Sequence, residues 1–264
     1  MSWFEAIILG LVQGLTEFLP VSSSGHLTIA KHLFGIETGD LTFEILVHAA
    51  TVLATIVVFR REILKLLQDL FKFRWNDGTR YIAMICVSMI PVLIVGLLLK
   101  DKVEDVFGSG LAVVGACLIV TAGLLMLSER LAARRQKEGE MNFKTAAWMG
   151  LAQAVAVLPG LSRSGSTIAT GLLCGTKRSE VAQFSFLMVL VPILGEAFLD
   201  LVGGEMVVSS GIGILPLILG FLSAFVSGIF ACKVMVALVR RAKLGWFALY
   251  CGIVGLACLI SLLF

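Results

Sequence analysis

Hydrophobic residues run in long stretches along this chain, separated by short polar or basic segments. A helix that crosses a bilayer needs about 20 mostly apolar residues, because the hydrocarbon core is about 30 Å thick. Several stretches approach this length, and we predict a transmembrane helix in each: Leu41–Phe59, Tyr81–Leu99, Leu111–Leu127, Val181–Val202, Ile212–Ala231 and Trp246–Phe264. The pattern therefore predicts an all-α integral membrane protein.

Two further apolar segments near the N-terminus are interrupted too early to cross the membrane. The first, Trp3–Leu19, ends at Pro20, which cannot continue a helix. The second, Ser24–Phe34, is closed by Gly35. A helix of about eleven residues rises only about 17 Å, well short of the bilayer core. We therefore predict that the two segments form a re-entrant helix hairpin.

The second half of the chain repeats this arrangement. Asn142–Leu158 ends at Pro159, and Ser164–Cys174 ends at Gly175. Identical residues recur at a fixed offset of 140: Gly10/Gly150, Leu11/Leu151, Gln13/Gln153, Ser22/Ser162, Ser24/Ser164, Gly25/Gly165, Leu33/Leu173 and Gly35/Gly175. We predict a single membrane domain, 1–264, with one repeat at 1–128, a second at 142–264 and a cytoplasmic linker at 129–141.

Each predicted repeat holds one hairpin and three transmembrane helices. Because three is odd, the two repeats must enter the membrane in opposite directions, which is the inverted-topology plan of many transporters. Most lysines and arginines lie in four segments: Arg60–Arg80, Glu129–Lys144, Lys177–Arg178 and Lys233–Lys243. The positive-inside rule makes these segments cytoplasmic, so both termini are predicted to face the exterior.

Composition supports the membrane assignment and excludes some functions. Of 264 residues, 58% are hydrophobic and 15% are charged, against about 45–50% and about 25% in soluble domains. The net charge of +3, without a basic block that contains aromatic residues, gives no reason to expect a nucleic-acid partner. The six cysteines lie in apolar segments without metal-type spacing, so they are typical of small buried residues.

The polar residues concentrate in one segment, Gln13–His26, with the sequence QGLTEFLPVSSSGH. Gln13 and Glu17 are four residues apart and share one helix face. A carboxylate inside the membrane is costly, and no cation lies within a helical turn of Glu17. We interpret Glu17 as a metal ligand or a general base. The alternative is a side chain that reaches the surface or pairs with a lysine.

The serines of this segment precede a helix, and the second repeat has a similar turn. Ordinary helix capping would explain such serines. The first turn of a helix also presents N–H groups and a positive dipole end, which together bind anions. Two such turns on opposed hairpins favour a phosphate site. We assign to it Ser22, Ser24, Gly25, Ser162, Ser164, Gly165 and Thr167.

One histidine and one arginine complete the candidate site. His26 lies in the first helical turn, beside the anion site, whereas His48 and His32 are typical of satisfied core histidines. Arg163 stands where the first repeat has Ser23. An arginine deep in a bilayer costs about 2.5–3.5 kcal/mol, and its forked donors fit phosphate oxygens. Phosphate binding therefore competes with a structural Arg163–Glu17 ion pair.

The two repeats differ in their chemistry, since Val157 stands where Glu17 would be. One half supplies a carboxylate, hydroxyls and an imidazole, and the other supplies an arginine and hydroxyls. This division favours an enzyme. The main alternative is a transporter or flippase of a polyprenyl phosphate or another anion, since inverted repeats are common in transporters. A purely structural scaffold fits the many buried polar groups poorly.

Two segments resemble a known family. Gln13–His26 (QGLTEFLPVSSSGH) and Pro159–Thr167 (PGLSRSGST) resemble the two signatures of the bacterial undecaprenyl-diphosphate phosphatases of the bacitracin-resistance type. The resemblance extends over essentially the whole chain. It implies hydrolysis of undecaprenyl diphosphate to undecaprenyl phosphate and inorganic phosphate, which recycles the lipid carrier for cell-wall synthesis. It also implies Mg²⁺ or Ca²⁺, and a site reached from the outer face of the inner membrane.

The family's acidic motif is (E/Q)xxxE, and this chain takes the Gln13 option, so Glu17 is its only full carboxylate. We expect Glu17, Ser23, His26 and Arg163 to be catalytic, and Glu17 with Gln13 to bind the metal. The nucleophile is either Ser23 or a nitrogen of His26. We prefer Ser23, which corresponds to Arg163 under the repeat. The expected partners are the isoprenoid diphosphate and membrane lipids, with a homodimer left open.

Overall fold

The computed structural model describes residues 1–36, 42–98, 110–135, 137–192, 195, 212–241 and 244–263. In these residues the chain forms eleven α-helices and no β-strand, so the predicted all-α class is confirmed. The helices are α1 (Trp3–Phe18), α2 (Ser23–Phe34), α3 (Thr42–Val58), α4 (Arg60–Leu70), α5 (Asp77–Leu98), α7 (Gly110–Ala133), α8 (Phe143–Val155), α9 (Arg163–Leu173), α10 (Arg178–Met188), α12 (Ile214–Arg241) and α13 (Gly245–Ser261).

Three of the described helices are long and apolar enough to cross a membrane: α5, α7 and α12. They correspond to three of the six predicted spans. Two other predicted spans form shorter helices, α3 and α13, of 17 residues each. The sixth, Val181–Val202, lies partly outside the described residues, and its described part includes most of α10. The chain is a multi-pass membrane protein.

The basic helix α4 follows α3 after a bend of 74°. None of its side chains is buried, and its leucines alternate with arginine, lysine and acidic residues at helical spacing. A helix with one apolar and one cationic face lies along a membrane surface rather than across it. The bend therefore separates the membrane-crossing part of this segment from its interfacial part.

α1 and α2 pack against each other as a helix hairpin at the predicted position. A capping box at Ser2 and Glu5 begins α1, which ends two residues before Pro20. Gly35 ends α2 in the left-handed conformation, with a φ of 63°, which glycine adopts at little cost. Local sequence thus decides both the length of these helices and the position of the turn.

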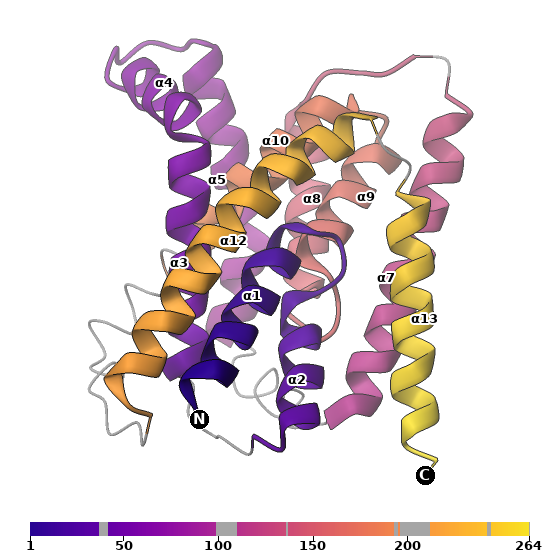
Figure 1. Cartoon of the computed structure of the whole chain (residues 1–264). Coiled ribbons are helices and arrows are strands. Elements are labelled where there is room, and N and C mark those ends of the chain that lie inside the picture. Colours follow the sequence, from indigo (N-terminus) through magenta and orange to yellow (C-terminus); the bar gives the residue numbers. More distant parts are fainter. Residues whose placement is uncertain are drawn as a thin grey trace.

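The second hairpin, α8 and α9, has the same plan. Asn142 caps the start of α8, and Gly160 and Gly175 adopt positive φ values of 87° and 86° in the turn and after α9. Figure 1 shows the two hairpins entering from opposite ends of the molecule, with both turns in its interior. The same view shows that α1 begins and α13 ends at one end of the molecule.

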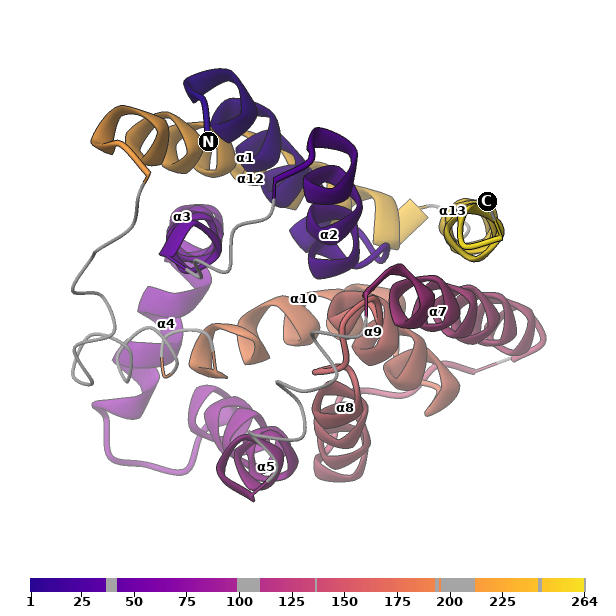
Figure 2. The same ribbon diagram turned by 90° about the horizontal axis from the view of Figure 1, so that it is seen from below.

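Each hairpin packs against a long helix through glycine. A Cβ at Gly10 of α1 would lie 2.4 Å from the carbonyl oxygen of Gly220 in α12. A Cβ at Gly150 of α8 would lie 2.3 Å from that of Ser88 in α5. Such close backbone contact needs small residues, as is common between membrane helices. In Figure 2, α12 and α3 lie beside the first hairpin, and α5 and α7 lie beside the second.

Buried apolar residues fill the space between the hairpins and the surrounding helices. The largest cluster includes Phe18 of α1, Met149 of α8, Ile168 of α9 and Met188 of α10. The outer faces of the long helices carry exposed apolar side chains, for example that of Leu97 in α5. An exposed apolar belt of this extent is expected where lipid is the solvent. The polar site is therefore enclosed by apolar structure.

Candidate active site

The two hairpin turns contact each other. The Ser164 hydroxyl, in the first turn of α9, donates a hydrogen bond of 3.0 Å to the carbonyl oxygen of Leu19, just after α1. A Cβ at Gly25 of α2 would lie 3.2 Å from the Cα of Gly160. The sequence predicted that the two polar segments meet, and these contacts confirm it.

Glu17 is the centre of this contact region. One carboxylate oxygen, Oε2, accepts hydrogen bonds from the Ser23 hydroxyl at 2.6 Å and from the Gln13 amide nitrogen at 2.9 Å. The other oxygen, Oε1, forms an ion pair with the Arg163 guanidinium. The Glu17 side chain is only 6% exposed. Because a buried charge is costly without partners, the ion pair and the two hydrogen bonds allow Glu17 to remain ionised here.

Arg163 begins α9 and faces Glu17 across the hairpin interface. Of the two roles left open for it, the structure shows the ion pair. Phosphate binding is compatible with that pair, because the contact uses Nη2 and a guanidinium carries five N–H donors. The side chain is 28% exposed, so part of the guanidinium is accessible to a bound group. Through Glu17, which both residues contact, its charge lies close to Ser23, the first residue of α2.

The serines that begin each hairpin's second helix cap that helix in the same way. The Ser22 hydroxyl accepts a hydrogen bond from the Gly25 N–H at 3.3 Å, and the Ser162 hydroxyl accepts one from the Gly165 N–H at 3.0 Å. Each lies 3.4 Å from the hydroxyl of the serine two positions later. The capping role considered for these serines is therefore present. Their assignment to phosphate binding stays a prediction.

Thr167, also assigned to phosphate binding, lies in the wall of the site. Its hydroxyl donates to the carbonyl oxygen of Arg163 at 3.0 Å and lies 2.7 Å from the Ser185 hydroxyl of α10. Thr167 is buried. These contacts hold the first turn of α9 against α10 and thereby fix the backbone that carries Arg163.

His26 has partners at both ring nitrogens. Its Nδ1 donates to the carbonyl oxygen of Ser22 at 2.7 Å, so Nε2 accepts from the Tyr250 hydroxyl, also at 2.7 Å. The two rings are stacked, with centroids 5.6 Å apart and planes 11° apart. No described hydrogen bond or ion pair joins His26 to Glu17. Tyr250 comes from α13, and sequence reasoning did not anticipate it.

His48 of α3 lies beside Glu17, where sequence reasoning had assigned it no chemistry. Its Nε2 is 3.9 Å from the Glu17 Oε2. One signal for this position is visible in the sequence: Glu44, His48, Thr51 and Thr55 follow each other at intervals of four, three and four residues. That spacing places them on one face of an otherwise apolar helix. The interpretation of His48 as an ordinary core histidine missed its contact with the site.

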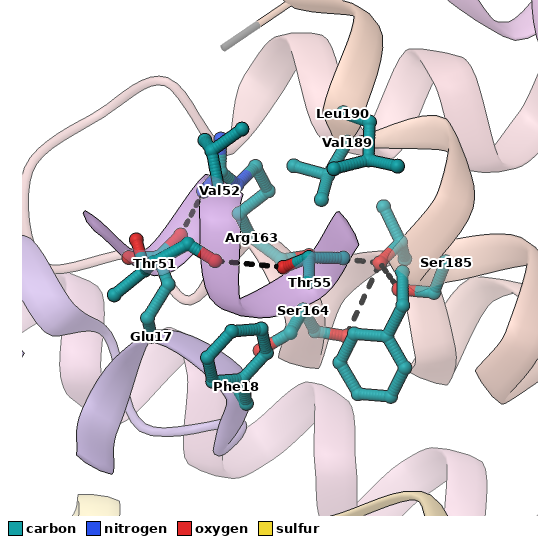
Figure 3. A pocket seen from close by; sticks show the side chains of 12 residues that line it. Glu17, Phe18, Thr51, Val52, Thr55, Arg163, Ser164, Ser185, Val189 and Leu190 are labelled. Atoms are coloured by element: carbon teal, nitrogen blue, oxygen red, sulfur yellow. Dashed lines mark hydrogen bonds and ion pairs between the residues drawn. The ribbon is translucent and has the colours of Figure 1, made fainter. Parts of the chain in front are cut away.

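A small cavity lies next to the Glu17–Arg163 pair (Figure 3). The centre of a water-sized sphere can occupy about 20 Å³ of it, which is room for about one water molecule. Its wall combines polar side chains with apolar ones from α1, α3, α10 and the residues just after α10. It is lined by Glu17, Phe18, Thr51, Val52, Thr55, Arg163, Ser164, Thr167, Ser185, Phe186, Val189 and Leu190.

Other charged residues, for which the sequence gives no reason to expect a role in the site, form ion pairs between helices where the structure describes them. Glu44 pairs with Lys31 between α3 and α2. Arg178 lies 3.3 Å from Glu129, which joins α10 to α7. Glu196 and Asp200 fall outside the described residues. These described pairs therefore hold helices together.

The site combines a buried carboxylate, a hydroxyl that donates to it and an arginine paired with it. These are the groups of a phosphoryl-transfer site, here inside a multi-pass membrane protein.

Residues 6–257 match the family described as "Bacitracin resistance protein BacA". A Bacteroides fragilis relative named "Undecaprenyl-diphosphatase" is 56% identical over 98% of both chains. Relatives with that name are 58% identical in Parabacteroides distasonis, over 97% of both chains, and 44% identical in Christiangramia forsetii, over 98% of both. The chain belongs to the BacA family.

Proposed function

We propose that this chain is an undecaprenyl-diphosphatase. It hydrolyses undecaprenyl diphosphate to undecaprenyl phosphate and inorganic phosphate, which returns the lipid carrier to cell-wall synthesis and supports resistance to bacitracin. The observation that carries the proposal is the Ser23–Glu17–Arg163 arrangement at the meeting point of the two hairpin turns. The name shared by the relatives gives the substrate.

Ser23 is the proposed nucleophile. Its hydroxyl already donates to Glu17 at 2.6 Å, so Glu17 takes the proton as the serine oxygen attacks the terminal phosphorus. The bond from that phosphorus to the bridging oxygen breaks, and undecaprenyl phosphate leaves. The proton passes from Glu17 to the departing phosphate oxygen, which restores the carboxylate. Glu17 then takes a proton from the water that attacks the phosphoserine, and returns it to the Ser23 oxygen as the bond to phosphorus breaks and inorganic phosphate leaves. His26 is less suited to attack, because both its ring nitrogens have partners.

Arg163 is the proposed phosphate clamp. Negative charge on the transferred group grows at its equatorial oxygens, and a fixed guanidinium in a water-poor site stabilises that charge. The hydroxyl of Ser164 and the N–H groups at the starts of α2 and α9 are the further proposed contacts.

A divalent cation, Mg²⁺ or Ca²⁺, fits the acidic side of the site. Gln13 is fully buried, and its amide oxygen lacks a hydrogen-bond partner among the described residues. The amide nitrogen of Gln13 lies 2.9 Å from the Glu17 carboxylate, so its unpaired amide oxygen and that carboxylate belong to neighbouring side chains. Glu17 and Gln13 would hold the cation. When bound, it would supply positive charge that neutralises the diphosphate.

The proposed architecture is an inverted repeat with two re-entrant hairpins. Equivalent caps begin α2 and α9. The close glycine contacts exchange partners between halves, since α1 packs on α12 and α8 packs on α5. The positive-inside rule favours a position for α4 on the cytoplasmic side of the bacterial inner membrane. An active site that opens toward the outer face is what the resemblance to the family implies. The isoprenoid tail would remain in the lipid.

An inverted repeat is also compatible with a transporter, so the function needs a test that separates the two. We expect the purified protein in detergent micelles, without any gradient, to release inorganic phosphate from undecaprenyl diphosphate. Glu17→Gln should release none. Absence of phosphate release by a folded protein that moves the lipid across vesicle membranes would refute the proposal and support a flippase.

A homodimer gains no support from the small residues of α12. They contact helices of the same chain: the Ser223 hydroxyl donates to the Ile7 carbonyl oxygen at 2.8 Å. A Cβ at Gly228 would lie within 3.2 Å of Ala54. The small residues of α12 therefore pack helices together within one protomer.

A further inference from the structure

A histidine that the reaction scheme above does not use lies within reach of Glu17. His48 belongs to α3, a helix that follows the first hairpin and packs against α12. Its Nε2 lies 3.9 Å from the Glu17 Oε2, and its side chain is 30% exposed, so the ring borders the site. The distance is too long for a hydrogen bond. Two donors at this distance are close enough to share one ion.

The backbone of α3 determines which nitrogen of His48 faces the site. Its Nδ1 lies 2.8 Å from the carbonyl oxygen of Glu44, one turn earlier in the same helix. A carbonyl oxygen only accepts, so Nδ1 must carry the proton. In the neutral ring, Nε2 then presents its lone pair toward Glu17. Metal-binding histidines are commonly oriented in this way, with the other ring nitrogen donating to a carbonyl group.

Three electron-pair donors are therefore available: two face each other, and the third belongs to the amide group that hydrogen-bonds to Glu17. They are the Glu17 carboxylate oxygen Oε2, the lone pair of the His48 Nε2 and the amide oxygen of the buried Gln13, which lacks a hydrogen-bond partner among the described residues. With ligand distances of about 2.1 Å, two donors can share an ion when they lie no more than about 4.2 Å apart. The separation of 3.9 Å between His48 and Glu17 meets this limit.

We propose that His48 is a ligand of the divalent cation, together with Glu17 and Gln13; this rests on the cation that the proposed function requires. The chemistry of the donors sets the preference of the site. Mg²⁺ and Ca²⁺ favour oxygen ligands, whereas an imidazole nitrogen favours transition metals. The site should therefore bind Mn²⁺ more tightly than Ca²⁺. The ion would also link α3 to α1, because His48 belongs to α3 and Glu17 and Gln13 belong to α1.

Mn²⁺ is the probe, because its paramagnetic resonance spectrum reports both binding and a coordinated nitrogen. The wild-type protein in detergent should bind Mn²⁺ and show hyperfine coupling to a ligand nitrogen. His48→Gln should lose that coupling and bind Mn²⁺ at least about tenfold more weakly. The matched control is His32→Gln, because His32 lies exposed near the end of α2 and should leave the spectrum unchanged.

A labelled protein keeps the test valid if the variant fails to fold. Wild-type protein made with histidine enriched in the heavy nitrogen isotope should show the coupling pattern of that isotope. Absence of Mn²⁺ binding, absence of nitrogen coupling, or coupling that persists in folded His48→Gln would each overturn the proposal.

Phosphate release measured on the same sample separates this proposal from the function. Wild-type protein that hydrolyses undecaprenyl diphosphate but shows no nitrogen coupling refutes the His48 ligand alone. Wild-type protein that shows the His48 coupling but releases no phosphate refutes the proposed function and leaves the ligand assignment standing.

Discussion

Removal of the Arg163 guanidinium should affect stability and turnover separately. Arg163→Ala leaves the Glu17 carboxylate, 6% exposed, without its cationic partner. Loss of one partner of a buried ion pair costs about 3–5 kcal/mol. The hydrogen bonds from Ser23 and Gln13 remain, and Arg163 is partly exposed, so we expect the low end, about 3 kcal/mol. For a chain of this size that corresponds to a fall in Tm of roughly 6–12 °C.

A second substitution distinguishes the two effects. In Arg163→Ala combined with Glu17→Gln, the buried group is neutral, so most of the lost stability should return. Turnover should not return, because the phosphate clamp and the base are both absent. For Arg163→Ala alone we expect the rate of phosphate release to fall by about 10³-fold or more.

Thermal unfolding in detergent and phosphate release from undecaprenyl diphosphate are the two assays. The reasoning is wrong if Arg163→Ala unfolds at the wild-type temperature, since Glu17 would then not depend on that charge. It is equally wrong if Arg163→Ala hydrolyses the substrate at a near-normal rate.

Three further substitutions test other parts of the account. Ser23→Ala should lower turnover by at least about 10⁴-fold, with a smaller fall in Tm than Arg163→Ala because Glu17 loses one hydrogen bond and keeps its ion pair; substantial residual phosphate release would exclude a serine nucleophile. Tyr250→Phe keeps the ring stack but removes the donor to His26, so kcat should fall while KM stays constant; a change in KM alone would contradict a role in orienting His26. Gly150→Ala should destabilise by about 1–3 kcal/mol, because its Cβ meets a backbone carbonyl of α5. Gly123→Ala, with nothing within 4 Å, should be neutral in the same unfolding assay.

Much of the fold could be predicted because local signals determine it. Pro20 and Gly35 end the helices of the first hairpin, and the match at offset 140 places the second hairpin. Long apolar stretches identified α5, α7 and α12. The predicted span Leu41–Phe59 agrees with α3, Thr42–Val58, and the chain bends where the basic helix α4 begins.

The site was predicted in part. The meeting of Glu17, Ser23 and Arg163 followed from the prediction that the two repeats oppose each other, since each residue lies at or next to a hairpin turn. The positions of His48 and Tyr250 depend on how α3 and α13 pack around the hairpins. Local sequence does not encode such contacts between distant segments. The polar stripe that contains His48 was nonetheless visible as a helical spacing.

The central claim is that Ser23 accepts the phosphoryl group with Glu17 as its base. The most direct test is rapid acid quenching of the enzyme during turnover of undecaprenyl diphosphate that is radiolabelled in its terminal phosphate. We expect an acid-stable label in the peptide that contains Ser23, and no label in Ser23→Ala. An acid-labile label on His26 would contradict the claim, because phosphohistidine would identify the imidazole as the nucleophile.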